Sequence, residues 1–153
     1  MKKAGIEFSR SFLYFVTLIL TFAAIACSVK LVADYDEATD KSVTELQRKM
    51  EAFLVDIQRK VGTDEAAYSN HIGFYDDVHV DISAVKVRAA AREKNEITLE
   101  QLDLVQKNLD NLEKLHKLGF NSPQEIEPLR KAFNASFTAI LKFELAKKRG
   151  KEI

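Results

Sequence analysis

The sequence predicts an all-α fold, in which an N-terminal signal or anchor segment (residues 1–29) precedes an antiparallel four-helix bundle (residues 30–153). Two observations predict the bundle. Four segments carry apolar residues at spacings of three and four, which is the period of an amphipathic helix. The connections between these segments are short, and four such helices pack most simply in an up-down-up-down arrangement. Once the N-terminal segment is set aside, the remainder is long enough for one domain with a single core.

The N-terminal segment has the composition of a signal peptide or a membrane anchor. Lys2, Lys3 and Arg10 precede a stretch without charge that runs from Ser11 to Val29. This stretch is about as long as the longest secretory signal cores and close to the ~20 residues that cross a bilayer, so its length fits both interpretations. Either one places residues 30–153 in the periplasm of a bacterial cell envelope.

Cys27, the single cysteine of the chain, follows Ala24, Ile25 and Ala26. These four residues resemble the lipobox of bacterial lipoproteins, in which the cysteine is acylated and becomes the N-terminus after cleavage. The resemblance implies lipidation of Cys27, and Ser28 in the next position implies an outer-membrane destination. Lipidation would also remove a free thiol that has no disulfide partner in an oxidising compartment. The alternative is that Cys27 is an apolar residue of an uncleaved anchor in the inner membrane.

The first two helices are predicted from apolar stripes and glycines. The first helix carries its stripe over residues 43–57 and ends before Gly62, and Thr63 can cap a second helix that breaks or bends near Gly73. Residues 78–87 also alternate between apolar and polar side chains like a half-buried strand. Helix is the favoured interpretation because no second strand-like run exists to pair with them.

The third and fourth helices have the clearest start signals. Thr98 and Gln101 have the spacing of a capping box, and Gly119 marks the end of the third helix. Ser122 followed by Pro123 is typical of a helix N-terminus and begins the fourth helix. The apolar stripe of the fourth helix is predicted to consist of Phe133, Phe137, Ile140, Leu141 and Leu145.

Two carboxylate–histidine pairs are the candidates for a metal site. Asp76 with His79, and Glu113 with His116, each place a carboxylate and an imidazole one helical turn apart. Pairs of this kind on two helices resemble the di-iron sites of ferritin-like bundles. Residues 132–143 of the fourth helix, however, contain no carboxylate that could complete the ligand set. Histidines at the surface or at a helix end are therefore the favoured interpretation, and neither a metal nor another cofactor is expected.

Charge is balanced overall but unevenly distributed. The 23 basic and 23 acidic residues cancel, so no net field favours nucleic acid. The bundle begins with an acidic cluster over residues 34–40 and ends with a basic cluster: Lys147, Lys148, Arg149 and Lys151. In an up-down-up-down bundle both clusters lie at the membrane end, where the basic cluster could pair with the acidic one or bind anionic lipid headgroups. Solvated charges at a helix C-terminus explain the basic cluster at least as well.

These features favour a non-enzymatic function. The sequence contains no phosphate-binding loop, zinc-protease helix or nucleophile elbow, so no enzymatic activity is expected. The favoured hypothesis is a periplasmic bundle, held at a membrane by a lipid or an anchor, that binds a protein partner or acts as an accessory subunit. A ligand- or metal-binding sensor is the first alternative. A phage-type envelope or lysis protein is the second, although several short capped helices argue against the long extended helix that such a role prefers.

Overall fold

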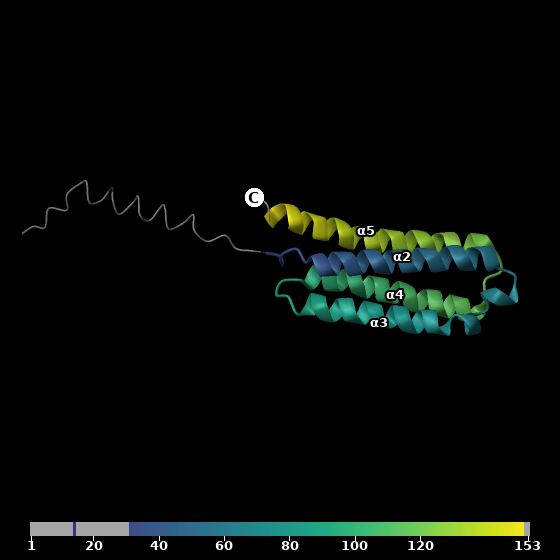
Figure 1. The fold of residues 1–153 in the computed structure, drawn as a ribbon. Helices are drawn as coiled ribbons and strands as arrows, with labels where there is room; N and C mark the ends of the chain where they lie inside the picture. The colour runs from purple at the N-terminus through teal and green to yellow at the C-terminus, as the bar shows by residue number, and fades with distance from the viewer. Residues whose placement is uncertain (1–13, 15–30, 152–153) are drawn as a thin grey trace, which may run out of the picture. The chain divides into compact units, whose positions relative to one another are not determined.

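Four α-helices make up most of the part of the chain that the structure, a computed structural model, describes: residues 31–151 and Tyr14 (Figure 1). Labelled as in Figure 1, they are α2 (Glu37–Lys60), α3 (Ile72–Ala90), α4 (Glu96–Leu118) and α5 (Ile126–Lys151). Residues 78–87 lie inside α3, so the helical interpretation of this segment is confirmed. The described residues contain no strand.

Each helix runs antiparallel to the next one along the chain. Between α4 and α5, for example, Thr98 bonds to Glu144 and Asn108 bonds to Ser136, so residue numbers rise on one helix as they fall on the other. Helix α2 packs against both α3 and α5, which closes the bundle. The start of α2, the α3–α4 loop and the end of α5 lie together at one end, named here the base (Figure 1). The opposite end, which contains residues 61–71 and 119–125, is named the tip.

The core is built from the inner stripes of all four helices. On α2 the predicted stripe is buried throughout: Val43, Leu46, Met50, Phe53 and Ile57. Buried stripes on the other three helices complete one continuous cluster. Removing each large apolar side chain from water contributes about 1.5–3 kcal/mol, so this cluster supplies the main drive for folding.

The prediction of a second helix that starts after Thr63 and breaks or bends near Gly73 is wrong, because α3 starts only at Ile72 and runs without interruption to Ala90. Gly62 follows α2 with a φ of +86°, a conformation that glycine adopts without steric cost. Two short 3-10 turns, Asp64–Ala66 and Tyr68–Asn70, then lead into α3. Gly73 itself lies in the first turn of α3, so it does not interrupt the helix.

The capping box predicted at Thr98 and Gln101 is wrong. Helix α4 begins at Glu96, after Asn95, and Thr98 is buried inside the helix. The Asn95 side chain donates a hydrogen bond to the Ala89 carbonyl, 2.9 Å away, which ties the start of α4 to the end of α3. The Thr98 hydroxyl bonds to a side chain of α5 instead of capping its own helix. The predicted terminus at Gly119 is confirmed, with a φ of +84°.

Candidate functional site

Two of the predicted metal candidates, His79 and Glu113, face each other between α3 and α4. The distance from His79 Nε2 to Glu113 Oε2 is 3.6 Å, and His79 Nδ1 lies 2.7 Å from the side-chain nitrogen of Gln106. Glu113 Oε1 also accepts a hydrogen bond from the Tyr68 hydroxyl (2.6 Å) and lies 2.7 Å from Lys117 Nζ. Hydrogen bonds from Lys117 and Tyr68 lower the pKa of Glu113. The Glu113 carboxylate therefore interacts with three side chains: Tyr68, His79 and Lys117.

His116 is buried at the tip and uses both of its ring nitrogens. Its Nε2 lies 2.7 Å from the Ala66 carbonyl, which can only accept, so this nitrogen carries the proton. The Tyr75 hydroxyl, 2.8 Å away, then donates to Nδ1, and burial raises the pKa of Tyr75, which keeps that hydroxyl protonated. Burial also lowers the pKa of His116, which favours the neutral ring. His116 is thus fully engaged in hydrogen bonds within the bundle.

The four metal candidates do not converge on one point. Asp76 is exposed on α3, whereas His116 is buried. Within residues 31–151, no group of three or more His, Cys, Asp or Glu side chains could hold a metal ion.

An aromatic cluster surrounds His116 and joins the turns of the tip to the core. Five rings have centroids within 5.3–5.9 Å of the imidazole: Phe53, Tyr68, His71, Tyr75 and Phe120. Phe74 stacks on Phe53 with a centroid distance of 3.7 Å. Aromatic pairs with centroids about 4.5–7 Å apart add about 0.5–1.5 kcal/mol each beyond the area they bury. The cluster therefore packs the turns of the tip against the core.

The structure divides the predicted basic cluster. Lys148 and Arg149 are exposed on α5, and the side chain of Lys151 lies outside the described residues. Lys147 is not on the surface: its side chain is only 2% exposed. Its Nζ donates to Glu144 Oε1 (2.6 Å), Thr98 Oγ1 (2.8 Å) and Asn95 Oδ1 (2.6 Å). The side chain of Lys147 therefore lies inside the base and not with the exposed charges of the predicted interaction cluster.

The signal for this buried pair lies in the period of α5. Glu144 and Lys147 follow Ile140 by four and seven residues, so they continue the buried stripe. The predicted stripe continues through Leu141 and Leu145 instead, of which Leu141 is partly buried against the core. Leu145 is 45% exposed in the structure.

The first residues of the bundle are fixed at the base. The Ala33 amide donates to the Lys94 carbonyl, 2.9 Å away. Asp36 caps α2 by accepting hydrogen bonds from the backbone amide and the hydroxyl of Thr39. Partial burial works against ionisation of Asp36, but the Thr39 hydrogen bond and the positive charge of Arg92 lower its pKa.

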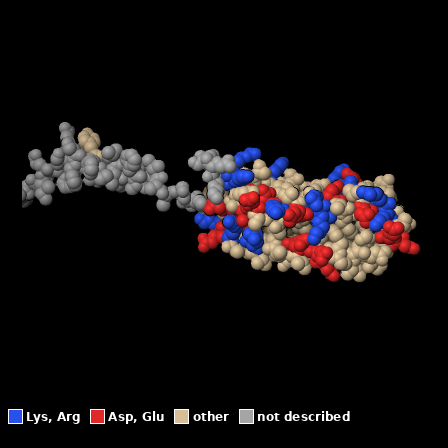
Figure 2. All heavy atoms as spheres, viewed as in Figure 1, with Lys and Arg blue, Asp and Glu red and all other residues tan. Residues whose placement is uncertain are grey.

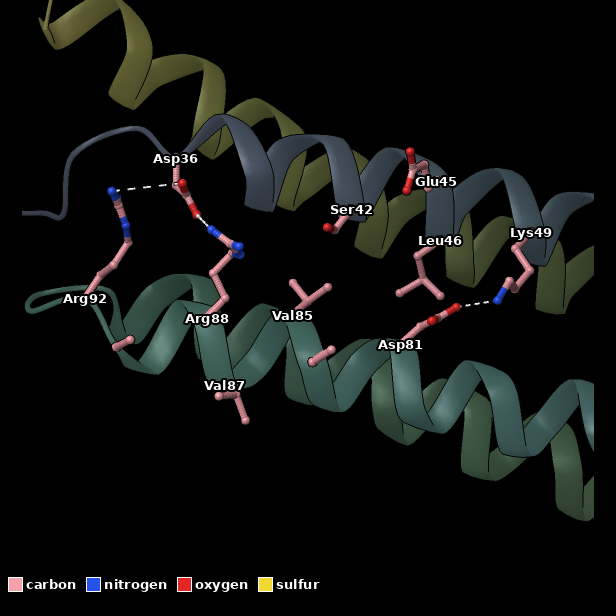
Figure 3. A pocket seen from close by; sticks show the side chains of 12 residues that line it. Asp36, Ser42, Glu45, Leu46, Lys49, Asp81, Val85, Val87, Arg88 and Arg92 are labelled. Carbon is pink, nitrogen blue, oxygen red and sulfur yellow. Dashed lines mark hydrogen bonds and ion pairs between the residues drawn. The ribbon is translucent and has the colours of Figure 1, made fainter.

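A groove of about 810 Å³ lies between α2 and α3 and is drawn in Figure 3. Leu46 from α2 and Val85 from α3 both point into it. At its base end Asp36 lies 3.7 Å from an Arg88 nitrogen and 4.0 Å from an Arg92 nitrogen, and farther along an ion pair joins Lys49 to Asp81 (Figure 3). These charges pair with one another across the groove, and they connect α2 with α3 and with the loop that follows it.

Cys27 and the predicted anchor, residues 12–29, lie outside the described residues except for Tyr14. Among the described residues, no helix combines the length and the apolar character needed to cross a membrane. Comparison of the chain with protein-family models, curated proteins and solved structures finds no match.

Proposed function

We propose that this chain is a bacterial envelope protein in which the helical bundle faces the periplasm and is held at a membrane through its N-terminal segment. The bundle binds a protein partner or serves as an accessory subunit, and it acts without catalysis. In the favoured form Cys27 carries a lipid and the protein resides at the outer membrane. In the alternative form residues 12–29 remain as an uncleaved anchor in the inner membrane.

The observation that carries this proposal is the hydrogen bond from Ala33 to Lys94, together with the Asp36 cap. These contacts make the chain part of the bundle from residue 33 onward. Only residues 28–32 then separate Cys27 from the fold, and a fully extended chain of that length spans about 20 Å. A tether this short would keep a bundle attached through Cys27 close to its membrane.

The polar groups of the interior support an interaction role for the outer surface. Inside the bundle Glu144 forms an ion pair with Lys147. Separately, the neutral His116 is hydrogen-bonded to Tyr75. They stabilise the fold instead of facing a ligand. On the surface, positive and negative side chains are interspersed over the face shown in Figure 2. Mixed charge of this kind favours specific pairing with a complementary protein surface over nonspecific attraction.

Protease accessibility in intact cells and spheroplasts tests the proposed location. The wild-type chain should sediment with membranes, resist external protease in intact cells, and be digested once the outer membrane is opened. Cys27→Ser is the matched variant, because it removes the acylation site and leaves the apolar segment intact. Digestion that occurs only after the inner membrane is lysed would show that the bundle is cytoplasmic and would contradict the proposal.

A further inference from the structure

A groove lies on the outside of the bundle between the second half of α4 and the first turns of α5. A volume of about 490 Å³ is lined there by residues that include Asn111, Leu115 and Ala132. Residues seven apart lie on nearly the same line of a helix, so Asn111 and Ala132 each mark a row. The α4 row is Ile97, Leu104, Asn111 and Leu118, and the α5 row is Ala132, Ala139 and Ala146. These two rows with Leu115 are named here the α4–α5 face.

The large apolar side chains of this face are exposed. Ile97 is 45% exposed, Leu104 56% and Leu118 84%, and all three alanines of the α5 row are exposed as well. Single exposed leucines are ordinary, but several exposed apolar side chains gathered on one face indicate an interaction surface, and Leu115, 43% exposed, lies one turn after the polar Asn111 of the α4 row. The large side chains of the α4 row lie beside the small alanines of the α5 row, and a groove of this kind can receive a helix. From Ile97 to Leu118 the row is about 30 Å long, the length of a helix of about 20 residues.

Charged rows flank the α4–α5 face and are predominantly positive. On α4 the neighbouring row is Glu100, Lys107 and Lys114, and on α5 it is Ala135, Lys142 and Arg149. These charged side chains are exposed, and within residues 31–151 none of the four cations takes part in an ion pair. Four cations against one carboxylate attract an acidic partner. Two copies of this face would place like charges opposite each other, which disfavours self-association.

We propose that the α4–α5 face binds an acidic amphipathic helix of a protein partner. The apolar side of that helix lies on the α4 row and the α5 row, and its carboxylates lie beside Lys107, Lys114 and Lys142. This inference rests on the proposed function as an interaction protein and gives it a surface and a partner chemistry.

Disulfide trapping with a synthetic peptide tests the face. The probe is a 21-residue amphipathic helix with a leucine stripe, glutamates on both flanks and one central cysteine, and the matched probe carries lysine in place of every glutamate. The full chain is reconstituted in zwitterionic lipid nanodiscs with Ala139→Cys on the face. Ala52→Cys is the control position, because Ala52 is exposed on α2 one turn from the cation Arg48. The unsubstituted chain measures how much peptide is trapped by Cys27 alone.

At least tenfold more of the glutamate probe should be trapped at position 139 than at position 52. The lysine probe should be trapped at background level. The double variant Lys107→Glu with Lys114→Glu should lower trapping at position 139 at least fivefold. Both lysines are exposed and form no ion pair within residues 31–151, so the helical circular dichroism should be unchanged.

Equal trapping at the two positions, or trapping that ignores the charge reversal, would overturn the proposal. A disulfide-linked dimer of Ala139→Cys formed without peptide would also overturn it, since it would show that a second copy covers the face. Failure of the proposed location is measured separately, by protease accessibility of the wild-type chain. The two outcomes are therefore distinguishable.

Discussion

Glu144 Oε1 and Lys147 Nζ lie 2.6 Å apart on successive turns of α5, with side-chain exposures of 0% and 2%. Removing two charges from water is costly, and mutual attraction compensates only when further hydrogen bonds are made. Here Thr98 and Asn95 of the α3–α4 corner supply those bonds to the ammonium group. The pair therefore fixes how the end of α5 is aligned along the start of α4.

Replacement of Lys147 by methionine should destabilise the bundle by about 3–5 kcal/mol, because it leaves the Glu144 carboxylate buried without its counter-charge. Urea unfolding of the purified chain, followed by far-ultraviolet circular dichroism, measures this change. The double variant Glu144→Leu with Lys147→Met should recover most of the loss, since it removes both charges.

The control for this prediction is Lys148→Met, at the adjacent exposed lysine. Its effect should stay within about 0.5 kcal/mol, as for most surface substitutions. A loss from Lys147→Met no larger than that of the control would show that the internal pair does not stabilise the fold.

His116 makes stability depend on pH between about 7 and 5. Because burial lowers its pKa in the folded chain, the unfolded chain binds a proton more readily as the pH falls through the ordinary histidine value of about 6.5. The free energy of unfolding should therefore decrease from pH 7 to pH 5. Asp36 and Glu113, whose pKa values are lowered, lose their contributions only at more acidic pH.

His116→Gln is the variant that isolates this effect, because glutamine does not titrate. Its unfolding free energy should be lower than that of the wild type at pH 7 but should change less between pH 7 and pH 5. Parallel pH profiles for the two chains would show that another group is responsible.

Tyr75→Phe removes the hydroxyl that donates to His116 Nδ1. The buried ring nitrogen then has no donor, and an unsatisfied buried acceptor costs about 1–3 kcal/mol. Tyr68→Phe serves as the comparison, because Tyr68 is only partly buried and bonds to Glu113. Thermal unfolding should place the Tyr75 variant clearly below the Tyr68 variant, and the reverse order would contradict the assignment.

Asp36→Ala removes the cap of α2 and a partner of Arg88 and Arg92. A lost cap of this kind costs about 0.5–2 kcal/mol. Asp36→Asn keeps a capping oxygen but removes the charge, so it should retain most of the stability. Urea unfolding of both variants separates the cap from the ion pairs, and equal losses would show that the charge, not the cap, is the stabilising feature.

The helical period of α2 predicts most of its core, because every apolar residue of the stripe is buried; Leu54, which is also buried, lies beside the stripe and is missed. Helix α3 was ambiguous for a physical reason: Val80 and Val87 are 67% and 69% exposed, so apolar side chains occupy its outer side as well as its inner side. That outer pair creates the alternation with the buried Val78, Ile82 and Val85 that resembles a strand.

The polar interior could not be predicted from local patterns alone. A lysine near a helix C-terminus is usually solvated, and only the register of α5 against α4 places Lys147 beside Thr98 and Asn95. The same holds for His116, whose partners Ala66 and Tyr75 are far from it in the sequence. Antiparallel packing of α3 on α4 brings His79 beside Glu113, and no residue pattern within either helix shows this contact.

The intact mass of the chain extracted from membranes tests the central claim, attachment through the N-terminal segment, most directly. For the favoured form, the mass should correspond to residues 27–153 plus acyl chains, and Cys27→Ser should abolish that species. A full-length, unmodified chain in the membrane fraction would contradict lipidation, and the uncleaved anchor would then be the remaining form of the proposal. A chain recovered only in the soluble fraction, without acyl chains, would contradict membrane attachment altogether.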